Sequence, residues 1–261
     1  MSSNYIMEDD REAQRLTQKV DPSSWVERYY IPYLSSANLV LDVGCGPGAL
    51  AAEIARRFPD KTIVGVDASE SRLEFASKNH EYQNLSFECA DSTKLPFPDQ
   101  HFDVVYSRLM LEYLQNPETA ISEMARVCKP GGHVILQDLD GQIVWHHPVP
   151  EFEADILTVI DELKKTGFDV FVGRKLFFHA KNTDLSNVTV KLDPYHLYAG
   201  QISDKELEDW TLKLDIALPQ IEKVHGKEKA LEFRQKFLSY LQDENTLTYS
   251  VMFTVVGQVA S

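Results

Sequence analysis

The sequence predicts an α/β fold with a doubly wound sheet of about seven strands, most of them parallel. Three observations predict it. Short, nearly all-apolar segments alternate with helical patterns from residue 39 to residue 137, as expected when both faces of a parallel sheet are buried. The first segment, 39–43, runs directly into a Gly-rich turn and then an Ala-rich helical pattern. The last segment, 246–256, alternates apolar and polar residues like a strand.

The N-terminal part precedes the first strand and has helical character. No ordered structure is expected over 1–10, whereas 11–20 has a helical pattern and 21–23 resembles a turn that starts another helix. Trp25, Val26, Tyr29 and Tyr30 fall at helical spacing. We expect residues 1–37 to form an N-terminal helical cap over a ligand site. The alternative is that these aromatic side chains only pack on the edge of the sheet.

The central elements follow in regular alternation. Lys129–Gly132 is typical of a tight turn before the fifth strand. Ser69 is expected to cap the second helix. We predict strands over 39–43, 62–67, 85–89, 102–107 and 133–137, and helices over 48–58, 70–79 and 117–128.

After residue 139 the alternation changes. A loop with Trp145, His146, His147, Pro148 and Pro150 is expected, followed by further elements. These are helices over 151–165, 173–181, 203–216 and 226–242, a strand over 187–192 and the final strand over 246–256. The two helices before the final strand exceed what a hairpin needs, so residues 200–243 are predicted to form a helical lid inserted in a domain spanning 38–261.

The composition limits the classes of function. The formal net charge of −14 repels phosphate backbones, so nucleic acid is not the expected partner. The three cysteines have no metal-like spacing and suggest a reducing, cytoplasmic compartment. No apolar run approaches 18 residues, so no membrane association is expected. The expected partner is a small molecule, and the protein is expected to be a monomer or homodimer.

The glycine turn and three aspartates indicate the ligand. The glycines at 44, 46 and 48 are spaced G-x-G-x-G rather than G-x-G-x-x-G, and Asp42 precedes them. A carboxylate there suits a ligand with a sulfonium and an ammonium group better than a pyrophosphate. Asp67 ends the second strand, where an acid can bond ribose hydroxyls. Asp91 follows the third strand, where it can accept from an adenine amino group.

At this point the sequence resembles a known family. Five segments, in order and correctly spaced, are similar to motifs of class I S-adenosylmethionine-dependent methyltransferases, and most closely to the UbiE-like subgroup that methylates small molecules. The segments are Leu39–Gly48, Gly65–Ser69, Ala90–Phe97, Phe102–Pro117 and Arg126–Leu136. The resemblance covers roughly residues 38–140. It implies a Rossmann-like fold with an antiparallel last strand, and S-adenosylmethionine as the cofactor.

The resemblance also implies roles for individual residues. Asp42 faces the cofactor's amino group, Asp67 binds the ribose, and Arg15 pairs the carboxylate unless it is simply a solvated helix residue. Gly44, Cys45, Gly46, Ser107 and Arg108 line the methionine part through backbone. The adenine is met by Ala68, Asp91 and Ser92, and Tyr29 from the N-terminal part completes the cofactor-binding set.

Candidate catalytic residues follow from the rule that ligands bind at the carboxyl ends of strands. His146, Asp138 and Tyr113 are the candidates for a general base, where one is needed. Asp138 and Asp140 do not complete a legible metal site, so no metal is expected.

The predicted activity is methyl transfer from S-adenosylmethionine to an O, N, S or C nucleophile of a small molecule. An NAD(P)-dependent oxidoreductase is an alternative that Asp42 and the glycine spacing argue against. A non-catalytic regulatory protein that binds S-adenosylmethionine is a second alternative.

Overall fold

One seven-stranded sheet runs through residues 21–260, the part of the chain that the computed structural model describes. Its order is β3-β2-β1-β4-β5-β7-β6, with β7 antiparallel to both of its neighbours and the strands from β3 to β5 parallel. The predicted α/β class and the antiparallel last strand are confirmed. The strands are β1 (Leu39–Val43), β2 (Thr62–Asp67), β3 (Leu85–Cys89), β4 (Phe102–Arg108), β5 (Cys128–His147), β6 (Leu185–Ala199) and β7 (Leu247–Val259).

Side-chain caps fix where several helices begin. Ser69 accepts from the Arg72 N–H, which confirms the predicted cap, and Ser203 forms a capping box with Glu206. The helices are α2 (Pro22–Trp25), α3 (Ile31–Leu34), α4 (Ala49–Arg57), α5 (Glu70–Asn79), α6 (Pro117–Val127), α7 (Glu153–Lys165), α8 (Leu176–Lys181), α9 (Asp204–His225) and α10 (Lys227–Leu241), with a π-helical turn η1 (Val26–Tyr30) and 3-10 turns η2 (Leu111–Tyr113) and η3 (Gly173–Lys175).

The sheet is buried on both faces in its parallel part. Alternate residues of β1 point to opposite sides, so Val40 packs in one cluster and Leu41 in the other. The helical segments η1, α3 and α4 cover the Val40 side, whereas α6 and α8 cover the Leu41 side. The apolar runs of the parallel strands are explained by this double burial.

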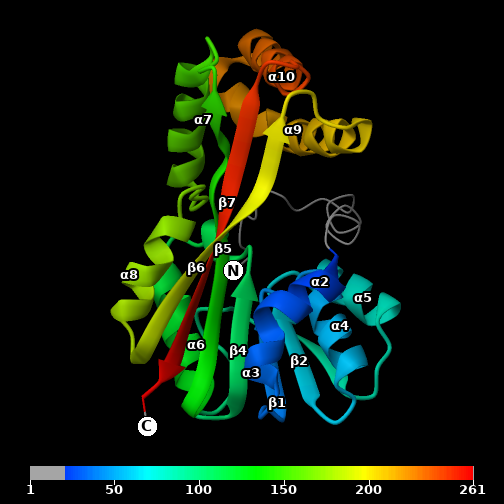
Figure 1. Cartoon of the computed structure of the whole chain (residues 1–261), viewed down its shortest axis with the longest axis vertical. Coiled ribbons are helices and arrows are strands. Elements are labelled where there is room, and N and C mark those ends of the chain that lie inside the picture. The colour runs from blue at the N-terminus through cyan, green and yellow to red at the C-terminus, as the bar shows by residue number, and fades with distance from the viewer. Residues whose placement is uncertain (1–20, 261) are drawn as a thin grey trace.

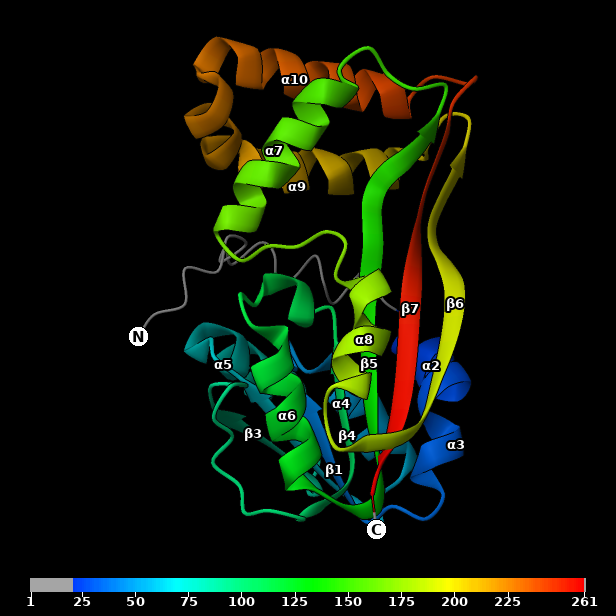
Figure 2. The ribbon, with the colours of Figure 1, turned by 90° about the vertical axis from the view of Figure 1, so that its left-hand side faces the viewer.

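A second helical part sits at the far end of three long strands. β5, β6 and β7 continue past the layered sheet, and α7, α9 and α10 pack there around a separate apolar cluster that includes Phe152, Ile160, Leu214 and Phe233 (Figures 1 and 2). We call α7, α9 and α10 the helical cap; it is distinct from the N-terminal cap expected over 1–37. None of the helices in the described part of the chain combines the length and hydrophobicity that crossing a bilayer requires.

Two sequence predictions about this region were wrong. The fifth strand was expected over 133–137 only, and a loop was expected around His146 and His147, but β5 spans Cys128–His147. The sixth strand was expected over 187–192 but spans Leu185–Ala199. Pairing with β7 explains why both strands continue past their predicted ends, because distant backbone supplies hydrogen bonds that the local sequence does not indicate. The predictions for 1–10 and 11–20 fall outside the described residues.

Candidate active site

The glycine turn after β1 is pinned to the end of β2. The N–H groups of Gly44 and Cys45 both donate to the Val66 carbonyl, at 2.7 and 2.9 Å, and the Gly46 N–H donates to Asp67 Oδ2 at 2.8 Å. These N–H groups are therefore occupied, and a ligand would meet the remaining bare surface of the turn. A Cβ placed on Gly46 would have no atom within 4 Å, so the turn faces open space there.

Asp67 connects the turn to the next helix. Its Oδ1 accepts from the Ser69 N–H at 2.9 Å while Oδ2 holds Gly46, and the side chain is nearly buried. A carboxylate offers about four lone-pair positions, so each oxygen keeps room for one more donor. Asp67 thus fits two ribose hydroxyls, as the resemblance implies.

Asp42 is buried beside Tyr106, its register partner on β4. Burial is the main cause that raises the pKa of Asp42 to about 7; the Tyr106 hydroxyl and the Arg108 guanidinium lower this pKa, and the Asp67 charge raises it. A cation that arrives next to Asp42 would favour the ionised form. This carboxylate therefore fits the amino group of S-adenosylmethionine and would oppose a pyrophosphate.

A row of buried polar groups continues from Asp42 across the same face of the sheet. The Tyr30 hydroxyl donates to Gln137 Oε1, and Gln137 Nε2 donates to Thr254 Oγ1 at 2.8 Å. The Tyr30 and Tyr106 rings lie 4.7 Å apart. Sequence reasoning missed Gln137, because an apolar strand with one polar residue gives no sign of which helix supplies its partner.

Arg108 lies between aromatic rings at the end of β4. Its guanidinium carbon is 4.6 Å from the Trp25 ring centroid and 5.8 Å from that of Tyr195. The buried Nε and Nη2 atoms have no hydrogen-bond partner among the described residues. A guanidinium in this state is suited to an anion such as a carboxylate. The sequence assigned only a backbone role to Arg108, because Tyr195 is distant in the chain.

The remaining predicted cofactor residues border this region. Tyr29 is buried and stacks on Trp25 at 4.7 Å, while Ser107 is fully buried at the end of β4. Burial raises the pKa of the Cys45 thiol well above its usual value, which argues against a nucleophilic role. Ala68 and Asp91 are exposed and Ser92 is half-buried, just past β2 and β3. Arg15 lies outside the described residues.

Asp138 is fully buried and holds the turn η2. Its Oδ1 accepts from the Leu139 N–H at 2.8 Å and its Oδ2 from the Glu112 N–H at 3.1 Å. Burial and the nearby Glu112 charge raise the pKa of Asp138 well above its usual range. With both oxygens engaged by backbone, the geometry favours a positioning role for Asp138 over direct proton transfer.

Asp138 and His146 lie far apart along β5, so the three candidate catalytic residues do not form one site. Tyr113 ends η2, and its ring lies 5.0 Å from that of Phe168. His146 lies in the distal part of β5, near Tyr240 and 3.6 Å from a Glu153 oxygen. Asp138 and His146 pair with Phe253 and Thr248 on β7, five residues apart, which is about 17 Å along a strand.

Asp140 is engaged by Arg174 rather than available to a metal. Arg174 Nε and Nη2 donate to its two carboxylate oxygens at 2.6 and 2.7 Å. Within residues 21–260 there is no group of three or more His, Cys, Asp or Glu side chains placed to hold a metal ion.

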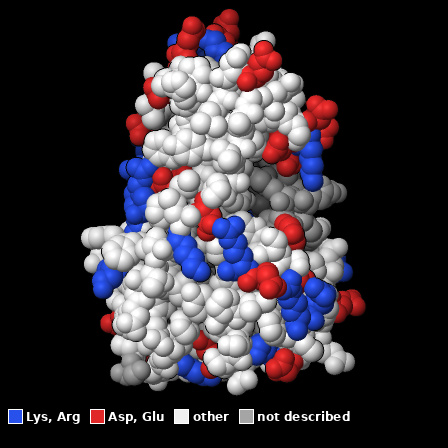
Figure 3. Space-filling view, viewed as in Figure 1, with Lys and Arg blue, Asp and Glu red and all other residues white. Residues whose placement is uncertain are grey.

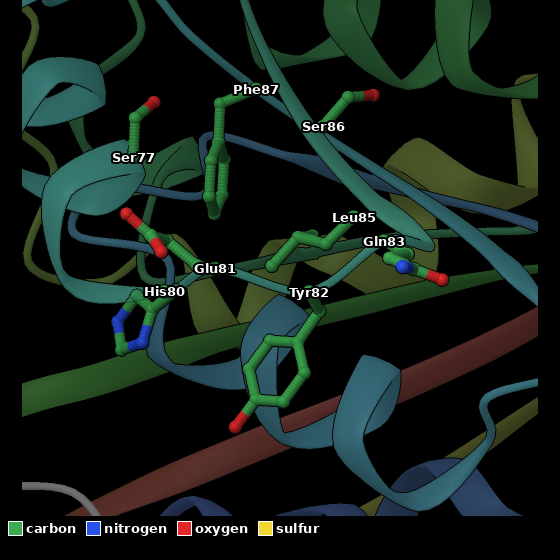
Figure 4. A pocket seen from close by; sticks show the side chains of 8 residues that line it. All are labelled: Ser77, His80, Glu81, Tyr82, Gln83, Leu85, Ser86 and Phe87. Carbon is green, nitrogen blue, oxygen red and sulfur yellow. The ribbon is translucent and has the colours of Figure 1, made fainter.

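A hollow separate from this site lies beside α5 and β3. An open hollow of about 550 Å³ lies between the end of α5 and the start of β3, lined by residues such as His80, Tyr82 and Phe87 (Figure 4). It sits at the amino end of β3, opposite the edge where ligands bind to such sheets.

On the face shown in Figure 3, basic side chains are interspersed with acidic ones and form no continuous basic surface.

Comparisons with known proteins agree with this geometry. Residues 41–136 match the model of a family described as a methyltransferase domain. An uncharacterised methyltransferase of Schizosaccharomyces pombe is 35% identical over 49% of this chain and 49% of the relative. A fatty-acid O-methyltransferase of Mycolicibacterium smegmatis is 28% identical over 75% of this chain and 65% of the relative. The chain thus spans less than two thirds of either relative.

A solved structure shows the same fold. The phosphoethanolamine N-methyltransferase 2 of Haemonchus contortus, in complex with S-adenosyl-L-methionine, superposes with a TM-score of 0.57 at 17% identity, over 95% of this chain and 52% of the other.

Proposed function

From the premise that this chain carries a class I S-adenosylmethionine-dependent methyltransferase domain of the small-molecule type, we propose that it transfers a methyl group to an O, N, S or C nucleophile of a small molecule. The observation that carries the proposal is the glycine turn flanked by two carboxylates. Asp42 lies buried before this turn, and Asp67 holds it from the side.

The residues of the chain would bind and orient the cofactor. Asp67 would hold the ribose, Asp42 the amino group and Arg108 the carboxylate. When bound, S-adenosylmethionine supplies a methyl group that its sulfonium already activates, so the chain's main tasks are alignment and exclusion of water. The aromatic residues Trp25 and Tyr29 pack beside Arg108 and would contribute to that exclusion.

The alternatives have less support. A nicotinamide-dependent oxidoreductase would place a pyrophosphate at the glycine turn, close to Asp42 and Asp67. A non-catalytic regulatory protein remains an alternative that binding data alone do not separate from an enzyme.

The experiment has two stages. Calorimetry with S-adenosylhomocysteine and with NAD tests the cofactor; we expect heat only from the first. Transfer of labelled methyl from S-adenosylmethionine into a panel of small carboxylic acids, amines, thiols and phenols then tests catalysis. Binding of NAD alone would refute the proposal, and binding of S-adenosylhomocysteine without transfer into any class of acceptor would favour the regulatory alternative.

We also propose that no nucleic acid or membrane takes part, that the protein is a monomer or homodimer, and that it is cytoplasmic. The acidic net charge supports the first point, and the three free cysteines agree with a reducing compartment.

The division into an N-terminal cap, 1–37, and a domain over 38–261 with a lid over 200–243 also stays a proposal.

A further inference from the structure

A partly open cavity of about 120 Å³ lies among the helices of the helical cap. α7 contributes Ile160 and Leu163, α9 contributes Leu214 and Ile221, and α10 contributes Phe233. Every residue that lines the cavity is apolar or aromatic except Lys213, whose ammonium lies 4.7 Å from the Trp210 ring centroid. Protein interiors rarely keep voids larger than one water, because the lining side chains lose dispersion contacts. A cavity with this apolar lining therefore suits an apolar occupant.

One turn of chain links the cavity to the candidate active site. Tyr113 lines the cavity, and the preceding residue, Glu112, donates its N–H to Asp138, which lies just past the part of β5 that pairs with β4. The Glu112 carbonyl accepts from the Asp169 N–H at 2.7 Å, which leads into the Phe168 and Val170 side of the cavity. The turn η2 thus borders both the carboxyl edge of the sheet and the cavity.

The residues that line the cavity extend over a long stretch of α9. Its lining on α9 runs from Trp210 to Ile221, which is about 16 Å of helix. Its volume is similar to that of engineered cavities that hold a single benzene, about 150 Å³. A length of this kind with so little volume suits an alkyl chain better than a fused ring system.

We propose that the acceptor carries a linear hydrocarbon chain, which occupies the cavity of the helical cap while the accepting atom lies beyond Tyr113 at the sheet edge. This inference rests on the proposed function and adds the class of acceptor. Figure 2 shows the arrangement it needs, with α7 and α9 lying across the end of the layered sheet.

The test uses the full chain, saturated with S-adenosylhomocysteine, and linear carboxylates and primary alcohols of increasing length as probes, kept below micellar concentrations. Kd measured by calorimetry should fall roughly fourfold for each added methylene until the cavity is full. Ala217→Leu, which narrows the cavity, should weaken the longest bound probe at least tenfold and shorten the length at which affinity levels off.

Ala154→Leu is the matched control, because it makes the same substitution at an exposed position of α7. It should leave the length dependence unchanged. Affinities that do not depend on chain length, or equal effects of the two variants, would overturn the inference even if S-adenosylhomocysteine binds. Absence of S-adenosylhomocysteine binding, tested separately, would instead refute the proposed function.

Discussion

Asp67 at the end of β2 holds Gly46 in the glycine turn through a hydrogen bond of 2.8 Å from the Gly46 N–H to the Asp67 carboxylate. The same side chain also accepts from Ser69 at the start of the next helix. One carboxylate thus fixes the shape of the turn and faces the ligand that the turn would hold.

Asp67→Asn should therefore weaken cofactor binding. It removes a charged acceptor from the ribose and from the Gly46 N–H, and hydrogen bonds to charged groups contribute about 1.5–3 kcal/mol. We expect the Kd for S-adenosylhomocysteine to rise roughly 10- to 100-fold, measured by calorimetry. Asp60→Asn, at an exposed acid on the turn before β2, is the control. Equal Kd values for the two variants would refute the ribose role of Asp67.

Cofactor binding should depend on pH through Asp42. In the free protein the pKa of Asp42 is about 7, and the cationic amino group of the ligand lowers it in the complex. Below pH 7, binding must release a proton, so affinity should fall by up to tenfold per pH unit as pH decreases, and level off above pH 7. Calorimetry from pH 5.5 to 8.5 measures this. Asp42→Asn should bind more weakly and without this slope; a flat wild-type profile would contradict the assignment.

Two glycines should respond differently to alanine. Both have positive φ, 75° for Gly44 and 54° for Gly46, so each substitution strains the backbone by about 1–2 kcal/mol. At Gly44 the new Cβ would also lie 2.4 Å from Met110 Cγ, whereas at Gly46 it meets only open space. Gly44→Ala should lower the melting temperature more, and Gly46→Ala should lose more cofactor affinity. If Gly44→Ala lost more cofactor affinity than Gly46→Ala, the cofactor would not occupy the open space beside Gly46.

The ion pair of Arg174 with Asp140 should stabilise the base of the helical cap. Arg174→Ala leaves a nearly buried carboxylate unpaired and removes the packing of the guanidinium on Trp145 and Phe171. Because Arg174 is half exposed, we expect a loss of about 1–3 kcal/mol in the free energy of unfolding. Arg234→Ala, which breaks the more exposed pair with Asp215, should cost under about 1 kcal/mol. Denaturant titrations compare the two.

The two candidate bases, Tyr113 and His146, can be separated by kinetics once an acceptor is known. If the Tyr113 hydroxyl moves a proton, Tyr113→Phe should reduce kcat about 10²-fold with cofactor affinity unchanged. His146→Ala should leave kcat within about twofold, because its strand position lies far from Asp138 and the sheet edge. A large kcat loss in the His146 variant would reverse this assignment.

The sequence predicted the parallel part of the fold closely. The bounds of β1, β2 and β3 match the predicted ranges, because short apolar runs between clear turn and cap signals leave little freedom. The length of β5 was underestimated, since its distal half depends on pairing with β7, 100 or more residues later. Such pairing is set by tertiary packing, which local propensity does not record.

The candidate site shows the same division. Asp42, Gly46 and Asp67 follow from a contiguous motif and its spacing, so the sequence indicates them directly. The aromatic surroundings of Arg108 combine Trp25 with Tyr195, which are brought together only by folding. The cavity of the helical cap likewise depends on three helices whose apolar faces, taken one by one, are typical of ordinary packing.

The three long strands β5, β6 and β7 also set the distance between the helical cap and the layered sheet. Flexible linkers would allow the cap to move, but hydrogen-bonded strands hold it at a fixed distance from the sheet edge where the proposed acceptor would react. Adding two residues to each strand would preserve which side chains face inward and lift the cap by about 7 Å. The length of acceptor chain that the protein prefers could then be changed by extending these strands.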